Sequence, residues 1–246
     1  DAVGYSPLFM SGNWHADEEA RCIDVLRSRR VDGMIVLTGR LADSALRSLA
    51  RKLPVVVTGR SLKAGNLVSM DFDNREGARQ ATRHLIDLGH RRVAFIGGDP
   101  EHPDAIDRQQ GYRSAVEAAG LRFDPALVTQ GNFSEHSGLL AVERLMDSRT
   151  RFSAVFAAND QMAIGAALGL HRRGRRIPDD VSLVGFDDLA GSVYMLPPLT
   201  TVHNPIQEIG QLAARAMLNL VAGERPQIEV PAPRLIVRES TRAVTA

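Results

Sequence analysis

Short apolar runs alternate with segments of helical periodicity along nearly the whole chain, and this alternation constrains the fold more than any other feature. Apolar runs rich in β-branched residues predict strands at 31–37, 55–58, 68–72, 92–96, 154–158, 181–186 and 234–237. Apolar residues at helical spacing predict helices at 17–29, 42–52, 75–88, 107–119, 134–147, 161–173 and 207–222. Strands and helices that alternate in this way are typical of an α/β fold with doubly wound parallel sheets.

Glycines mark the carboxyl ends of four expected helices. The residue just past a helix often adopts the left-handed conformation, which glycine reaches without steric cost. Glycines stand at this position after four of the helices, namely Gly89, Gly120, Gly174 and Gly223. At an amino end, Ser134 carries a side chain that suits the N-cap of the helix that follows it.

Polar residues directly follow several expected strands. They are Thr58-Gly59, Gly97-Gly98-Asp99, Asn159-Asp160 and Asp187-Asp188. Carboxyl ends of parallel strands gather at one edge of a sheet, where ligands bind, and the helices that follow present unpaired N–H groups there. After Asp187-Asp188, Pro197-Pro198 forbids a helix and residues 200–202 resume an extended path. The sequence therefore predicts a site for a small polar molecule beside a crossover.

Length and charge set further bounds. A chain of 246 residues is too long to fold around one small hydrophobic core, so two lobes are expected. The net charge of +1 indicates no nucleic-acid-binding surface in these residues. No apolar run reaches the ~20 residues of a spanning helix, and no signal peptide is recognisable, so a cytoplasmic protein without a membrane partner is expected.

Catalytic and metal-binding motifs are missing from the sequence. It contains no P-loop, no GxGxxG and no GxSxG motif, and its seven histidines have no HExxH spacing. The lone Cys22 rules out an internal disulfide and a cysteine-based zinc site. We therefore expect a protein that is not an enzyme and that holds neither a metal nor a cofactor.

Five motifs, in this order, resemble the lactose-repressor/galactose-repressor family of bacterial transcription factors. They are HLIDLGHRRVAFIGG at 84–98, VFAANDQMAIGAAL at 155–168, VSLVGFDD at 181–188, PPLTTV at 197–202 and LIVREST at 235–241. The resemblance covers nearly the whole chain. It implies the type I periplasmic-binding-protein fold, in which two doubly wound parallel-sheet lobes are joined by three crossovers.

The resemblance also implies where the lobes lie. The N-terminal lobe is expected at 1–72 plus 204–232 and the C-terminal lobe at 73–203 plus 233–246. The crossovers are placed near Phe72–Asn74, His203–Asn204 and Ala232–Arg234. Residues 1–10 are similar to the family's second strand, so a further strand and helix are expected before Asp1 in the intact protein.

The implied function is that of a transcriptional regulator. In the family, a small effector, here expected to be a sugar or related polar metabolite, binds between the lobes and changes how a helix-turn-helix headpiece grips operator DNA. That headpiece is not in this chain. A two-fold homodimer is expected, with Ile164, Leu168 and residues 194–196 as interface candidates, although core burial is an equal explanation for Ile164. The alternative function is that of a solute-binding protein for sugar uptake, which shares the fold.

Arg108 and Asp187 are the main effector-binding candidates. Arg108 precedes Gly111-Tyr112 at the spacing at which the family places an arginine that binds the effector. A guanidinium can donate paired hydrogen bonds to a carboxylate or to two sugar hydroxyls. From spacing alone, a solvated arginine or a partner of Asp104 or Asp107 is the more ordinary interpretation, and the resemblance reverses that preference. Replacement of Arg108 by Ala is expected to weaken effector binding and to leave folding intact.

The other candidates also have ordinary explanations. Asp187 is expected to accept hydrogen bonds from the effector, and Asp188 to serve local structure. The resemblance places Phe133 as a ring that stacks on the effector, whereas an isolated Phe is usually core. Asn159 caps a helix, binds the effector, or does both. Asp73, at the first crossover, is a weaker candidate, and Thr58 and His203 are weaker still. Gly59 stands where many relatives carry Asp, so this sequence departs from the family at one possible ligand contact.

Overall fold

The structure is a computed structural model that describes residues 4–37 and 39–244. Its internal contacts divide the chain into two compact units. The first comprises Asp1–Phe72 with Ile206–Pro231, and the second comprises Asp73–Pro205 with Ala232–Ala246. Both contain parallel sheets with helices, as the alternating sequence predicts. No helix in the described part of the chain is long and apolar enough to cross a membrane.

The first unit is built on a parallel sheet of order β1-β2-β3. Its strands are β1 (Met34–Val36), β2 (Val55–Thr58) and β3 (Leu67–Met70), and its helices are α1 (Ala16–Ser28), α2 (Asp43–Ala50) and α7 (Ile206–Val221). Successive residues of a strand face opposite sides of a sheet. Val55 and Val57 accordingly belong to the core cluster with Leu46 of α2, whereas Val56 packs against Ala213 of α7. Both faces of β2 are therefore covered.

The second unit contains a parallel sheet of order β5-β4-β6-β7. Its strands are β4 (Val93–Gly97), β5 (Val128–Gln130), β6 (Ala154–Ala157) and β7 (Ser182–Val184). Its helices are α3 (Asn74–Asp87), α4 (Pro103–Ala118), α5 (Glu135–Asp147) and α6 (Asp160–Arg172). An antiparallel pair, β8 (Thr201–His203) and β9 (Arg234–Ile236), lies beside it, and two short 3-10 helices are η1 (Pro125–Leu127) and η2 (Ala190–Tyr194).

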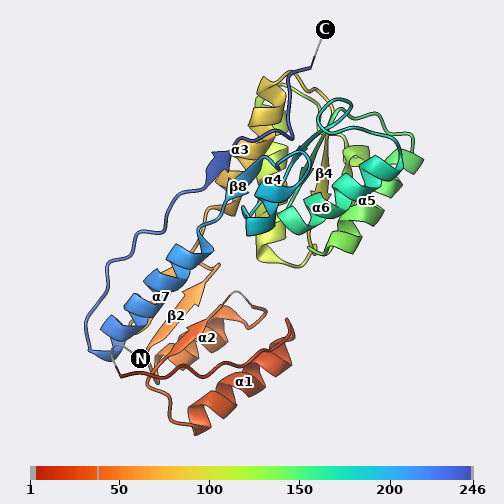
Figure 1. Cartoon of the computed structure of the whole chain (residues 1–246). Helices are drawn as coiled ribbons and strands as arrows, with labels where there is room; N and C mark the ends of the chain where they lie inside the picture. Colours follow the sequence, from red (N-terminus) through yellow and green to blue (C-terminus); the bar gives the residue numbers. More distant parts are fainter. Residues whose placement is uncertain (1–3, 38, 245–246) are drawn as a thin grey trace. The chain divides into compact units, whose positions relative to one another are not determined.

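Close helix pairs cover this sheet. Helix α3 packs against α4, and α5 packs against α6 (Figure 1). Glycines allow the close approach, since a Cβ on Gly165 would lie 1.8 Å from the Glu135 carbonyl oxygen and a Cβ on Gly111 would lie 2.2 Å from that of Arg75. The pairs hold the amino ends of α4 and α6 beside the sheet edge where the strands end.

The structure confirms the predicted helix ends and corrects two other predictions. Four residues past helix ends have positive φ angles, namely Gly89, Gly120, Gly174 and Gly223, and Ser134 caps α5 by accepting from Ser137 N–H. Helix α4 begins at Pro103 rather than at residue 107, because proline suits the first helical position. Strand β5 was not predicted, and it is only three residues long.

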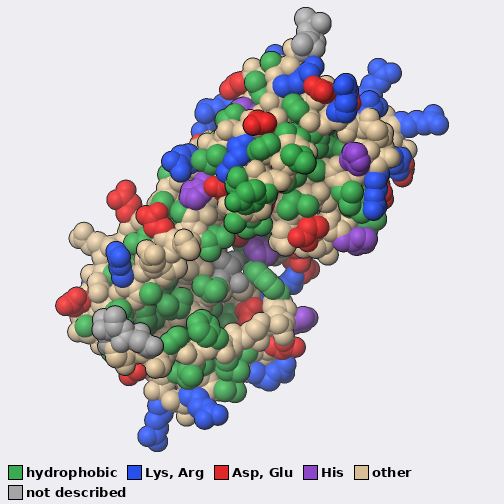
Figure 2. Space-filling view, viewed as in Figure 1, with side chains coloured by type: hydrophobic (Ala, Val, Ile, Leu, Met, Phe, Trp, Pro, Cys, Tyr) green, Lys and Arg blue, Asp and Glu red, His purple; other side chains and the backbone are tan. Residues whose placement is uncertain are grey.

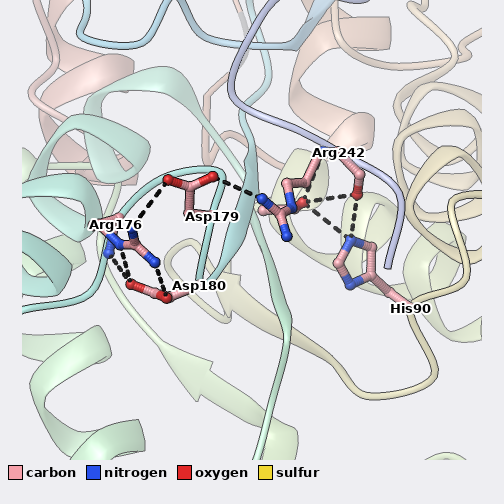
Figure 3. A network of polar contacts seen from close by, with 6 residues as sticks. His90, Arg176, Asp179, Asp180 and Arg242 are labelled. Carbon is pink, nitrogen blue, oxygen red and sulfur yellow. Dashed lines mark hydrogen bonds and ion pairs between the residues drawn. The ribbon is translucent and has the colours of Figure 1, made fainter. Parts of the chain in front are cut away.

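The carboxyl-terminal segment is fixed to the second unit by a polar network (Figure 3). The Arg242 guanidinium contacts Asp179 at 2.7 Å, and Arg176 pairs with Asp180 at 3.0 Å. The buried His90 ring lies 3.2 Å from the Arg242 carbonyl oxygen. Burial lowers the pKa of His90, while that carbonyl opposes the shift. These contacts hold the last described residues against strand β7.

Candidate functional site

Three neighbouring strands of the second unit, β4, β6 and β7, end side by side. Asn159 follows β6, Asp187 follows β7, and Arg108 lies in α4, the helix that comes after β4. Backbone hydrogen bonds continue past the strands, with Ala158 N–H donating to Ile96 O at 2.8 Å and Asp160 N–H donating to Phe186 O at 2.8 Å. Parallel strands bring these ends to one edge, as the sequence predicts.

Arg108, in the second turn of α4, is the centre of this cluster. Its Nε donates to Asn74 Oδ1 at 2.8 Å, and its Nη1 donates to the Ala158 carbonyl oxygen at 2.5 Å. Its Nη2 lies 3.1 Å from Oδ1 of Asp187. The guanidinium carbon also lies 3.8 Å from the centre of the Phe186 ring, a cation–π contact. Four residues from three segments of the chain therefore fix the orientation of one guanidinium.

The environment of Arg108 excludes the ordinary interpretations of this residue. Its exposure of 4% excludes a solvated side chain, and its carboxylate partner is Asp187 rather than Asp104 or Asp107. Asp107 pairs instead with Arg75, at 3.6 Å. Removal of the cation would leave the Asp187 carboxylate without its partner, so the structure leads us to expect that Arg108→Ala lowers stability, in contrast to the expectation from the sequence.

Asp187 occupies an unusual backbone conformation. Its φ of 101° and the φ of 69° at Phe133 lie in the left-handed region, which non-glycine residues rarely adopt and which is found at functional sites. Burial raises the pKa of the Asp187 carboxyl, and the Arg108 charge opposes this shift. The Asp187 side chain is 17% exposed, so it is not fully enclosed.

Asp188 has a different environment from its neighbour. Its Oδ1 accepts from Arg238 at 2.6 Å, and its Oδ2 lies 2.9 Å from Nδ1 of His203. Burial by itself would raise the pKa of Asp188, but the bonds from Arg238 and His203 lower it. These contacts join the end of β7 to β8 and to the segment after β9, which agrees with a role in local structure.

Phe133 and Asn159 lie in contact beside Arg108. The Phe133 ring centre is 6.0 Å from the Arg108 guanidinium carbon, and a Cβ on Gly98 would meet this ring at 2.2 Å. Asn159 caps α6, because its Oδ1 accepts from Met162 N–H, and its Nδ2 donates to the Phe133 carbonyl oxygen at 2.9 Å. Phe133 is half-buried, and Asn159 fixes its position.

Asp73 and the remaining positions are less tightly tied to this cluster. Asp73 is exposed and caps α3 by accepting from Glu76 N–H at 2.8 Å. His203 is the partner of Asp188. Thr58 and Gly59 belong to the first unit, and Gly59 has a φ of 67°. Of the proposed residues, the structure therefore brings together Arg108, Phe133, Asn159 and Asp187.

Sequence reasoning missed three polar residues. Asn74 accepts from Arg108, and Asn204 donates to Asp187 Oδ1 at 3.5 Å. Asp160 is fully buried and accepts from Ser192, Thr201 and Leu189. Its place in Asn159-Asp160 at a strand end was a signal, and the two asparagines lie in expected crossovers. Among the described residues no group of three or more His, Cys, Asp or Glu could hold a metal ion.

Comparison with known proteins identifies the family of this chain. The family model of the periplasmic binding protein-like domain matches residues 82–241. The HTH-type transcriptional regulator CelR of Thermobifida fusca is 38% identical over 228 residues, which cover 91% of this chain and 67% of that protein.

Solved structures agree with this match. A sugar-binding transcriptional regulator of the LacI family from Escherichia coli, complexed with phosphate, has a TM-score of 0.89 at 31% identity and covers 96% of this chain and 86% of its own. A CelR–cellobiose complex has a TM-score of 0.81 at 37% identity, with 92% and 71% covered.

The chain therefore has a periplasmic-binding-protein-like α/β fold. More narrowly, it belongs to the LacI/GalR family of transcriptional regulators and corresponds to the family's effector-binding domain. The relatives are regulators, so the alternative of a solute-binding protein for uptake is not favoured.

Proposed function

We propose that the chain is the sensor of a transcriptional regulator and binds a small polar effector at Arg108 and Asp187. The observation that carries this proposal is the buried ion pair at the edge where β4, β6 and β7 end. Three of the five guanidinium N–H groups are used by Asn74, Ala158 and Asp187. The remaining two can bind an effector, and Phe133 offers an apolar ring beside them.

The other proposed contacts follow from position. Asp187 accepts from the effector, Phe133 stacks on it, and the Asn159 amide holds Phe133 in place. Asp73 is retained as a contact at the first crossover. Effector binding changes the affinity for operator DNA of a helix-turn-helix headpiece that lies outside this chain. Such a regulator acts in the cytoplasm. Coupling of this kind is typically ~1–3 kcal/mol.

Calorimetry on Arg108→Ala tests the site. A thermal-shift screen of sugars, sugar phosphates, polyols and purines first identifies a ligand, because a ligand at 100 times its Kd stabilises by roughly 2.7 kcal/mol. A lost charge-assisted hydrogen bond is worth ~1.5–3 kcal/mol, so the variant should bind about ten-fold to a hundred-fold more weakly. Binding by folded Arg108→Ala as tight as that by wild type would place the effector site elsewhere.

Dimerisation is a second part of the proposal. Tyr194 and Leu196 are 83% and 95% exposed, and Leu168 on α6 is 44% exposed. Core burial therefore does not explain these three side chains, and hydrophobic side chains lie at the surface of the second unit among charged ones (Figure 2). Ile164 and Met195 are half-buried. Sedimentation should show a dimer at micromolar concentration that Leu196→Glu weakens, and a wild-type monomer would refute the interface.

A further inference from the structure

Arginines precede all four strands of the parallel sheet in the second unit. Because these strands are parallel, their amino ends lie at one edge of the sheet, opposite to the edge that contains Arg108 and Asp187. Blue side chains project from the upper end of the second unit in Figure 2. We name the following ten residues the arginine edge: Arg122 before β5, Arg91 and Arg92 before β4, Arg149 and Arg151 before β6, Arg172, Arg173, Arg175 and Arg176 before β7, and Arg242 near the carboxyl terminus.

Hydrogen bonds show that the segments before the strands are neighbours. Arg92 Nε donates to the Arg151 carbonyl oxygen at 2.6 Å, and Arg92 Nη2 contacts Asp124 at 3.1 Å. The Ser153 N–H donates to the Arg92 carbonyl oxygen, and the Ser182 N–H donates to that of Ser153, both at 3.1 Å. The loops that lead into β5, β4, β6 and β7 therefore form one continuous surface.

Most of the arginine edge is open to solvent and lacks a counterion. Nine of its ten side chains are exposed, and Arg242 is half-buried. Four of them contact aspartates, namely Arg92 with Asp124, Arg173 with Asp147, Arg176 with Asp180 and Arg242 with Asp179. In the described part of the chain the other six form no ion pair, namely Arg91, Arg122, Arg149, Arg151, Arg172 and Arg175. A negatively charged partner would therefore meet guanidinium groups that no carboxylate neutralises.

The charges of the second unit are segregated. The unit has eighteen arginines and eighteen Asp and Glu residues, so its net charge is zero with neutral histidines. Ten of these arginines form the arginine edge, whereas the helix ends and loops there contain six carboxylates, namely Asp87, Glu117, Asp124, Asp147, Asp179 and Asp180. The net charge of +1 is an average over the whole chain, so the expectation that these residues form no nucleic-acid-binding surface does not describe this edge.

The chemistry of the arginine edge favours phosphate groups. A guanidinium presents parallel N–H donors that match two oxygens of a phosphate. In the described loops that lead into the four strands, no large hydrophobic side chain is exposed. The core of a protein–protein interface is enriched in aromatic and apolar side chains, whereas contacts with a DNA backbone need mainly cations and polar groups. The surface therefore fits the backbone of a nucleic acid better than it fits an acidic protein.

The dimensions of the edge also suit a nucleic-acid backbone. Neighbouring strands lie ~4.8 Å apart, so the amino ends of four strands extend over roughly 15 Å. Duplex DNA carries one charge per ~1.7 Å of its axis, so several phosphates would face an edge of this length. Strand β4 has five residues, so about 16 Å separate the arginine edge from the opposite edge of the sheet. DNA bound at the arginine edge would therefore leave the site at Arg108 free.

We propose that the arginine edge is a sequence-independent contact for duplex DNA, additional to the helix-turn-helix headpiece outside this chain. The chain belongs to a family of transcriptional regulators, so DNA is the polyanion that such a protein meets. Contacts with phosphates add affinity for any DNA sequence, and they weaken steeply with salt because binding releases counterions. The inference concerns a surface outside the effector site, so it does not depend on the identity of the effector.

The first arm of the test measures binding by the chain itself, which includes no headpiece. Fluorescence anisotropy titrations use two labelled duplexes of about 20 base pairs with unrelated sequences, at about 25 to 200 mM KCl. Both should bind with similar Kd values of about 1 to 100 µM at low salt, and log K should fall with log salt with a slope of about −3 to −5, since each neutralised phosphate contributes about −0.9. No binding at low salt, a slope near zero or a strong preference for one sequence would overturn the inference.

The second arm removes three charges from the arginine edge. Arg122→Gln/Arg151→Gln/Arg172→Gln replaces exposed side chains that have no carboxylate partner, so the fold should be kept, which circular dichroism checks. The salt slope should become less negative by about 2 to 3, and the affinity at about 50 mM KCl should fall at least about ten-fold. DNA binding equal to that of wild type would refute the arginine edge as the contact.

A matched variant in the first unit controls for net charge. Arg51→Gln/Lys52→Gln/Arg215→Gln also removes three exposed cations, and it should change the affinity for DNA by less than about two-fold. A loss as large as that of the edge variant would mean that the overall charge of the chain determines binding, and it would overturn the inference.

Competition distinguishes DNA from an acidic protein. At equal concentrations of negative charge, unlabelled duplex should displace the labelled duplex better than poly-L-glutamate does, because the guanidinium groups match phosphates. Stronger competition by poly-L-glutamate would identify an acidic protein as the partner and would overturn the assignment of DNA.

Discussion

Replacement of Arg108 by Met should destabilise the protein strongly even without an effector. Met keeps the apolar stem and removes the guanidinium, so Asp187 loses its ion-pair partner at 3.1 Å, and Asn74 and Ala158 lose a donor. Breaking one side of a buried ion pair typically costs about 3–5 kcal/mol. Each kcal/mol lowers the Tm of a chain this long by roughly 2–4 °C, so a fall of about 6–20 °C is expected.

Arg113→Met is the matched control for this prediction. Arg113 lies on the same helix and contacts Glu117 at 2.7 Å, but its side chain is 60% exposed. Exposed pairs contribute ~0–1 kcal/mol, so this variant should change the Tm little. Unfolding is followed by far-ultraviolet circular dichroism with temperature and with urea. A cost for Arg108→Met no larger than that for Arg113→Met would refute the buried ion pair.

A double variant separates the ion pair from packing. In Arg108→Met/Asp187→Asn the carboxylate charge is also removed, and Asn tolerates the left-handed backbone that Asp187 adopts. The double variant should therefore be more stable than Arg108→Met alone, with a coupling of about 0.5–3 kcal/mol. Additive effects of the two substitutions would mean that the two side chains do not interact.

Two further predictions concern pH and packing. Burial raises the pKa of Asp160 to about 6, despite hydrogen bonds that lower it. The folded state then binds this proton more tightly than the unfolded state, so the free energy of unfolding should fall by about 2 kcal/mol as the pH rises from 4 to 6. Urea titrations should show that this slope is lost in Asp160→Asn. The half-buried His84 and the buried His90 have lowered pKa values and contribute an opposite slope in both proteins, and equal pH profiles would disprove the assignment. Gly165→Ala should cost about 1–3 kcal/mol by overpacking against Glu135, whereas Gly210→Ala, with open space around it in α7, should stabilise by about 0.5–1 kcal/mol; similar Tm shifts for both would contradict the packing argument.

Local patterns predicted the parts of the fold that local physics determines. The glycines after α3, α4, α6 and α7 adopt positive φ because a helix ends there whatever packs around it. Apolar runs predicted the central strands because a buried strand must be apolar on both faces. Strand β5 was missed because an edge strand of three half-exposed or exposed residues carries no such run. Pairing with β4 defines it.

The candidate site was predictable to the level of strand ends and no further. Parallel strands bring their carboxyl ends together, so residues 158–160 and 187–188 were expected to be neighbours. The partners of these residues come from far along the chain, since Asn74 is 34 positions from Arg108 and Thr201 is 41 positions from Asp160. No local pattern contains such a pairing, because only the packed tertiary structure creates it.

The choice between Asp187 and Asp188 shows how tertiary contacts complete the site. The Asp160 carboxylate occupies the space beside Gly185, where a Cβ would lie 2.2 Å from Oδ1, and it accepts from the Leu189 N–H at 2.8 Å. Asp187 N–H donates to Val202 O at 2.9 Å. These bonds fix the chain on both sides of the left-handed residues, so Asp187 faces Arg108 while Asp188 turns toward Arg238 and His203. The Asp160 carboxylate, which contacts neither Arg108 nor Arg238, therefore helps to fix the different directions of the two aspartate side chains.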